Sequence, residues 1–224
     1  MRRSVAALLR KDLRVELRTL AVLPGMVLFS ISIFVLMHFA LNRSSVEGDL
    51  AAGILWVALL FAALLGANRL FVADADQGGF DGFLLAPVPR SALLVAKVTT
   101  MLAFLAAVEV VAVPAFALLL LAPPLWPGLG WLVLVLALGD VGVALIVTLV
   151  AALAVRTRAR DLFGPLIALP LLLPIVIGGA RASSPLLSFG HVSTPAARWL
   201  AMLTLYDLIL GLIAFALFDF LLEE

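Results

Sequence analysis

The sequence predicts an all-α membrane protein with six transmembrane helices and no soluble domain of its own. Hydrophobic residues make up 65% of the 224 positions, and charged residues only 13%. A soluble domain carries about 25% charged residues because its surface faces water, so most of this chain's surface must face lipid. A span needs about 20 apolar residues. Suitable stretches cover residues 21–41, 50–67, 92–121, 129–155, 162–180 and 199–222, so the transmembrane domain is predicted over 21–222.

Residues 1–20 precede the first span and predict an amphipathic helix that lies in the membrane interface. Apolar residues recur on one side at helical spacing, while basic residues fall on the other side and would face anionic headgroups. The apolar side holds Val5, Leu8, Leu9, Leu13, Leu17 and Leu20, and the basic side holds Arg3, Arg10, Arg14 and Arg18. The alternative is a basic flank that only orients the first span.

The distribution of basic residues predicts that both termini lie in the cytoplasm, because short cytoplasmic loops carry an excess of Lys and Arg. With the N-terminus inside, only Arg43, Arg181 and Arg198 lie on the far side. The other twelve of the 15 Lys and Arg residues are then cytoplasmic. The inverted topology would require the larger group to be translocated, so we reject it.

The fifth predicted span is unusual because it contains three prolines, Pro165, Pro170 and Pro174. A proline inside a helix removes a backbone hydrogen bond and kinks the helix. Membrane helices tolerate this where neighbouring protein satisfies the freed groups. We therefore expect this span to be bent and packed against other helices.

The sequence lacks the motifs that several classes of function require. The sequence contains no G-x-x-x-x-G-K-[ST] phosphate loop, no H-E-x-x-H and no G-x-S-x-G, so an enzyme is not expected. It has no Cys and two His, and either His38 or His191 could ligate haem iron, although an isolated His is more often an ordinary interfacial residue. The four Trp residues lie near span ends, which is typical of interfacial anchors. Basic residues occur only in short stretches, and nucleic-acid binding is not expected.

Three carboxylates fall inside predicted spans, at Glu109, Asp140 and Asp207. An ionisable group at this depth costs about 2.5–3.5 kcal/mol, so it is usually buried among helices. Each could serve a proton or substrate path, or could be a protonated or hydrogen-bonded group that fixes helix packing. For Asp140, which is flanked by Gly139 and Gly142, we favour packing, because small neighbours indicate close helix contact.

The second span carries a ridge of small residues, Ala58, Ala62 and Gly66. Such ridges let helix backbones approach closely in lipid. The ridge therefore predicts a helix–helix contact, either within the chain or between subunits.

The second loop, residues 68–91, is the most informative connection in the chain. It combines charged residues with large apolar residues and is interrupted by glycines, a composition suited to docking a soluble partner. Phe80, Phe83 and Leu84 fall at the i, i+3, i+4 spacing by which a helix presents anchors to a groove. The alternative is a solvated loop that lies on the membrane.

The chain also resembles a known family, the haem exporter protein B (CcmB) family, the permease-like subunit of the cytochrome c maturation system. The resemblance runs through Gly53–Val57, Arg69–Phe71, Asp74, Gly78, Asp81, Leu84–Pro89, Ala96–Lys97 and Phe218–Glu224. With the six-span plan it covers nearly the whole chain. The double glycine Gly78-Gly79 departs from the single glycine expected there.

This resemblance implies a type-2 ABC-exporter-like arrangement in the inner membrane, with an interfacial N-terminal helix and a cytoplasmic coupling helix in the second loop. A separate ATPase subunit would bind ATP and dock on the coupling loop. The residues implied for docking are Asp74, Asp76, Phe80, Asp81, Phe83, Leu84 and Arg90. Haem would be the cargo of the complex, and this chain would bind no cofactor itself.

The resemblance further implies partners: a multispan haem-handling protein, a small single-span protein and a periplasmic haem chaperone, with a homodimer of this chain as a further candidate. Two other functions fit the same topology. One is the permease of a generic type-2 ABC exporter for a drug or lipid, and the other is a membrane scaffold that transports nothing.

Overall fold

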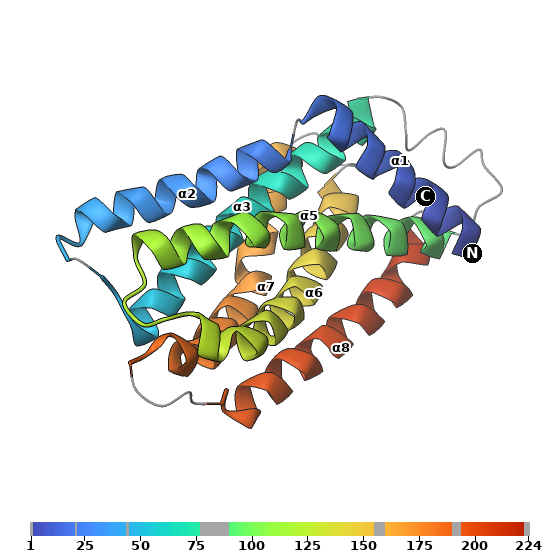
Figure 1. Ribbon diagram of the computed structural model, residues 1–224. Helices are drawn as coiled ribbons and strands as arrows, with labels where there is room; N and C mark the ends of the chain where they lie inside the picture. Colours follow the sequence, from blue (N-terminus) through green and yellow to red (C-terminus); the bar gives the residue numbers. More distant parts are fainter. Residues whose placement is uncertain are drawn as a thin grey trace.

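The computed structural model describes residues 2–20, 22–43, 45–76, 90–154, 160–189 and 194–221, which fold into a bundle of helices (Figure 1). Within these residues no β-strand occurs apart from an isolated bridge between Val46 and Leu121. The long helices are α1 (Arg2–Thr19), α2 (Leu23–Ala40), α3 (Gly48–Asp76), α5 (Arg90–Leu119), α6 (Leu129–Ala154), α7 (Arg160–Ser183) and α8 (Ala197–Leu221). Two short 3₁₀ helices, η1 (Trp126–Gly128) and η2 (Ser184–Leu187), lie between them.

Six of these helices, α2, α3 and α5 to α8, are long and apolar enough to cross a membrane. The prediction of an all-α membrane protein with six spans is therefore confirmed. The helices run roughly along one direction, so the bundle has two ends (Figure 1). Helix α1 lies across one end, where α3 and α8 end and α5 begins, and we call it the α1 end. Helix α1 begins and α8 ends on this side of the bundle.

The helix ends differ from the predicted span ends most clearly at α3. The second span was predicted to end at residue 67 and a loop to begin at residue 68, but α3 continues to Asp76. The residues after Ala67 are polar, so the chain leaves the hydrocarbon region there. Residues 68–76 nevertheless contain no Gly or Pro to break a helix. The predicted loop therefore begins with more than two further turns of helix.

Helix α7 remains helical through its prolines and packs against α3, α6 and α8. The backbone of α7 also accepts a hydrogen bond from a side chain of α8. The hydroxyl of Tyr206 on α8 donates a hydrogen bond to the carbonyl oxygen of Leu171, at 2.9 Å, in the turn between Pro170 and Pro174. This agrees with the expectation that the proline-rich span packs against protein.

The core of the bundle lies around α3 and α6. The spanning parts of these two helices are 67% buried, against 17% for α2 and α8, which lie at the flanks. Helix α6 contacts α3, α5, α7 and α8, so it is the central element of the fold. Side chains on α6 therefore face four of the other five spanning helices.

At the end of the bundle opposite α1, several contacts join the connecting segments and the ends of the helices. The N–H of Val46 donates to the carbonyl of Leu120 at 2.7 Å, and the N–H of Ala122 donates back to Val46 at 3.0 Å. An exposed ion pair joins Arg181 to Asp49 at 2.9 Å. The connection between α7 and α8 includes the 3₁₀ helix η2, which packs against α3.

Candidate functional site

The predicted docking segment begins and ends at the α1 end of the bundle. Phe80, Asp81, Phe83 and Leu84 lie outside the described residues. Asp74 and Asp76 belong to the last turn or so of α3, and Arg90 is the first residue of α5. The two helices that flank the segment therefore present its ends beside α1 (Figure 1).

Helix α1 is joined to α5 by a buried ion pair close to this segment. The ammonium group of Lys97 lies 2.9 Å from Oδ2 of Asp12, and the side chains are 4% and 5% exposed. The hydroxyl of Thr100 donates to the same oxygen at 3.3 Å. Lys97 lies about two turns after the start of α5. The start of α5 is therefore attached to α1 by charge as well as by packing.

Glu16 fixes the connection between α1 and α2. Its Oε1 accepts hydrogen bonds from the backbone N–H groups of Val22 and Leu23, at 2.9 and 2.7 Å. The first N–H groups of a helix have no partner within the helix, so Glu16 acts as a cap for α2 supplied from α1. Leu20, with a φ of 47°, turns the chain between the two helices.

Asp12 and Glu16 are the residues at this end that the sequence analysis missed. They lie four residues apart and so share one face of α1 with Leu8 and Leu13, and this face packs against the bundle. By contrast, Leu17 and Leu20 of the predicted apolar side are 73% and 59% exposed. Two acids at an i, i+4 spacing in an otherwise basic helix are the signal that could have identified this face.

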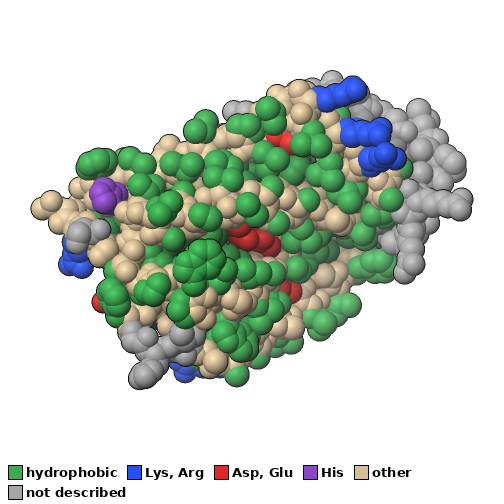
Figure 2. Space-filling model, in the orientation of Figure 1, with side chains coloured by type: hydrophobic (Ala, Val, Ile, Leu, Met, Phe, Trp, Pro, Cys, Tyr) green, Lys and Arg blue, Asp and Glu red, His purple; other side chains and the backbone are tan. Residues whose placement is uncertain are grey.

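Three basic residues of α1 lie on its exposed side. Arg10, Arg14 and Arg18 are exposed, and Lys and Arg side chains gather over α1 in Figure 2. Most of the remaining visible surface is hydrophobic, as expected for a protein embedded in lipid. The α1 end therefore carries a concentration of positive charge next to the flanks of the docking segment.

The three intramembrane acids all lie against α6. The carboxyl group of Glu109 on α5 is within hydrogen-bonding reach of that of Asp140 on α6. Asp207 on α8 meets the opposite side of α6, where its Oδ1 occupies the space that a Cβ of Gly142 would need. Asp140 and Asp207 are both 8% exposed. The described residues contain no group of three or more side chains that could hold a metal ion.

The small-residue ridge on α3 lies inside the chain. Ala58 and Ala62 are fully buried, and Gly66 faces Met26 of α2, whose side chain would overlap a Cβ at this position. The close approach of α2 and α3 at Gly66 thus depends on the absence of a side chain there. The sequence left open whether this ridge forms a contact within the chain or between subunits. The structure places these positions in a contact within the chain.

Trp56 was expected near the lipid headgroups, and this expectation is wrong. Its side chain is 3% exposed and its ring lies against Gly139 of α6 and Gly179 of α7. The indole N–H donates to the hydroxyl of Ser183 at 3.1 Å. The two glycines provide the room for the ring, so Trp56 connects three helices instead of anchoring one to the interface.

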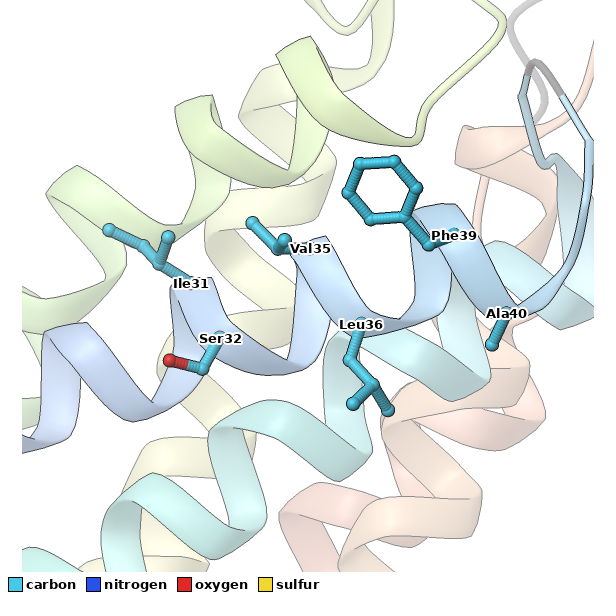
Figure 3. A pocket seen from close by; sticks show the side chains of 6 residues that line it. All are labelled: Ile31, Ser32, Val35, Leu36, Phe39 and Ala40. Atoms are coloured by element: carbon cyan, nitrogen blue, oxygen red, sulfur yellow. The ribbon is translucent and has the colours of Figure 1, made fainter.

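His38 lies near the end of α2 and contacts the end of α5. Nδ1 of His38 lies 2.7 Å from the carbonyl oxygen of Leu119, and because a carbonyl only accepts, this nitrogen donates. Figure 3 shows a shallow hollow on α2, where the hydroxyl of Ser32 is already bonded to the carbonyl of Leu28. The hollow is lined by Ile31, Ser32, Val35, Leu36, Phe39 and Ala40, all from one helix. His191 lies outside the described residues.

The fold has six helices that can span a membrane, and acids lie against α6 inside it. It therefore defines a polytopic helical membrane protein. The family model described as "CcmB protein" matches residues 3–220 of this chain. The chain therefore belongs to the CcmB protein family, as the resemblance in its sequence indicated.

Individual relatives support the same assignment. The chain is 34% identical over 176 residues to heme exporter protein B of Rhodobacter capsulatus, an alignment that covers 78% of this chain and 80% of the relative. It is 33% identical over 210 residues to heme exporter protein B of Pseudomonas aeruginosa, covering 93% of each chain. The protein of the same name in Bradyrhizobium diazoefficiens is 31% identical over 210 residues, again covering 93% of each.

Proposed function

We propose that this protein is the permease-like membrane subunit of an ATP-driven haem-export and cytochrome c maturation complex. Membership of the CcmB family, across residues 3–220, is the observation that carries the proposal. The relatives named above are called heme exporter protein B, and they cover most or nearly all of this chain. The protein is non-catalytic and receives its energy from a separate ATPase subunit, which binds the ATP.

The ATPase docks at the α1 end, which faces the cytoplasm of the cell together with both termini, in the inner membrane. The docking surface comprises Asp74 and Asp76 at the end of α3, the anchors Phe80, Phe83 and Leu84 with Asp81, and Arg90 at the start of α5. Support comes from the position of the two flanking helices, which carry the segment beside α1. The basic excess predicted for the cytoplasmic side also falls on α1.

Motion at this segment is transmitted into the bundle through α5. Its first turns are attached to α1 by the Lys97–Asp12 ion pair, so α1 and the start of α5 move as one unit. The work done is the delivery of haem, or the release of a haem-loaded periplasmic chaperone, and haem is cargo of the complex. A multispan haem-handling protein and a small single-span protein complete the complex, and a homodimer of this chain is a candidate arrangement within it.

The double variant Phe80→Ala, Phe83→Ala tests the docking surface. Truncating central aromatic anchors typically costs about 2 kcal/mol or more, which is a loss of roughly thirtyfold in affinity. We expect the ATPase subunit to be lost from pull-downs while this protein remains inserted in the membrane. The acidic side chains would contribute less, and their effect would weaken with salt.

A matched control removes two large apolar side chains elsewhere. Leu36 and Phe39 on α2 are 62% and 77% exposed and lie toward the opposite end of the bundle. The Leu36→Ala, Phe39→Ala variant should therefore keep its ATPase. Retention of the ATPase and of its stimulated hydrolysis by the Phe80, Phe83 variant would contradict docking on this segment, and α1 would become the better candidate.

A further inference from the structure

The three intramembrane acids meet α6 at one depth. Asp140 and Gly142, the positions that face Glu109 and Asp207, lie in the middle of the helix Leu129–Ala154. The middle of a span is where an ionised side chain is most costly. In Figure 2, acidic side chains are visible among hydrophobic ones in the middle of the face formed by α5, α6 and α8. We call these three residues the acid layer.

Within the acid layer, the contact between Glu109 and Asp140 needs a proton. An ionised carboxylate has only acceptor atoms, so two carboxylates cannot hydrogen-bond to each other. When one of them is protonated, its O–H can donate to the other. The second oxygen of Glu109, Oε1, is buried and has no hydrogen-bond partner, so no donor compensates a charge on this oxygen.

Asp207 gives an independent observation on the same turn of α6. Its side chain is more than nine-tenths buried, it points at Gly142, and neither carboxyl oxygen has a hydrogen-bond partner. An ionised carboxylate without a partner in an apolar environment is far more costly than the neutral acid. Ile175 of α7 fills the other side of the same space.

No positive charge of the described chain faces the acid layer. The spanning parts of the helices packed on α6 carry no Lys or Arg between residues 98 and 154 or between 166 and 180. Between residues 48 and 67 of α3 the only charged residue is Asp49, which is paired with Arg181 at the opposite end, and the only basic residue of α8 is Arg198 in its first turn. Tyr206, beside Asp207, is bonded to the backbone of α7. A proton is therefore the charge compensation that the chain itself can hold.

We propose that the acid layer is a proton-binding site: Glu109 and Asp140 share one proton, and Asp207 holds another. The shared proton joins α5 to α6, and the proton on Asp207 keeps α8 against α6. Removal of either proton leaves an uncompensated charge between packed helices. Stability of the α5–α6–α8 contacts is accordingly present when the groups are protonated and is lost as the pH rises.

Carbodiimide labelling tests this proposal, because dicyclohexylcarbodiimide reacts with protonated carboxyl groups in apolar surroundings. The acid proton moves to a nitrogen of the reagent while the carboxyl oxygen bonds to its central carbon, and the adduct rearranges to an N-acylurea without loss of any atom. Peptide mass spectrometry then locates the added reagent. Asp12 is the matched control, since it is equally buried but paired with Lys97.

We expect labelling of Asp207 and of the Glu109–Asp140 pair to exceed that of Asp12 several-fold, in the isolated chain and in the assembled complex, and to fall as the pH is raised. The isosteric neutral variants Glu109→Gln with Asp140→Asn, and Asp207→Asn, should assemble normally. We expect the melting temperature of the native protein to fall at alkaline pH, and this fall should be smaller in the neutral variants.

Two results would overturn the proposal. One is labelling of the acid layer no greater than that of Asp12, together with a melting temperature whose pH dependence is unchanged in the neutral variants. The other is labelling in the isolated chain that disappears in the complex, with neutral variants that fail to assemble. That pattern would show that a basic group of another membrane subunit, and not a proton, compensates these acids.

Discussion

The ammonium group of Lys97 and the carboxylate of Asp12 lie 2.9 Å apart in a contact almost closed to solvent, although the two residues are 85 positions apart in the chain. The pair joins a helix that lies across the end of the bundle to one that spans it. Both charges are buried, so the contact between them contributes to the charge compensation of each.

Loss of one partner should therefore be costly. Asp12→Ala removes the carboxylate of a buried ion pair, and breaking such a pair typically costs about 3–5 kcal/mol. We expect a clear fall in thermal stability in detergent and a weakened attachment of α1, measured by proteolysis of the N-terminal segment. Asp49→Ala, which breaks the exposed ion pair with Arg181, is the control and should cost about 1 kcal/mol or less. Equal effects of the two substitutions would contradict this account.

Glu16 should matter as a hydrogen-bond acceptor and not as a charge. Its Oε1 accepts from two backbone N–H groups at the start of α2, and Glu16→Gln keeps an oxygen at this position. Glu16→Ala removes it, and loss of a capping acceptor costs about 0.5–2 kcal/mol. We expect the Ala variant to melt earlier than the Gln variant. The same loss in both variants would indicate that the charge is what α2 requires.

The glycines around Trp56 should not tolerate a side chain. A Cβ at Gly139 or Gly179 would overlap the indole ring, and overpacking of this kind costs about 1–3 kcal/mol. Gly53 in the same region of α3 has nothing within 4 Å of its Cβ position. Gly53→Ala should therefore be neutral or stabilising by about 0.5–1 kcal/mol, because Ala is the better helix former. Melting temperatures of the three variants would check this order.

The topology can be read with reporter fusions. A reporter placed after Glu224 should be active on the cytoplasmic side, and one placed near His191 should be active on the far side. The reason is the excess of basic residues on the side assigned to the cytoplasm. A cytoplasmic signal from the fusion near His191 would contradict the six-span arrangement and the position of the docking segment.

Haem found in the purified complex should not depend on the histidines of this chain. No cluster of metal-ligating residues occurs among the described residues. We expect haem absorbance to survive the double replacement of His38 and His191 by Ala. If the absorbance disappears while the complex remains assembled, this chain supplies a ligand.

The positions of the spans could be read from the sequence because a helix in lipid must be apolar over its whole length. The end of α3 could not be read in the same way. A drop in hydrophobicity marks where a helix leaves the membrane and not where the helix ends. Residues 68–76 show this difference.

The partners of individual side chains were harder to predict. Glu109 and Asp140 are 31 positions apart, and their proximity depends on the angle at which α5 and α6 pack. Trp56 was assigned to the interface because its position near a span end is compatible with that role, while the glycines that receive it occur on two distant helices. Asp12 and Glu16 went unnoticed because basic residues dominate the helix that carries them.

The site that receives Trp56 is completed late during synthesis of the chain. Its hydrogen-bond acceptor, Ser183, follows 127 residues later. At the usual pace of about 5–20 residues per second, the ribosome needs about 6–25 s to reach it. During this interval the second span is already made, while the helices that cover the indole are not. Lipid chains or the insertion machinery must occupy that place on the nascent chain, and they must leave before the fourth and fifth spans can close around the ring.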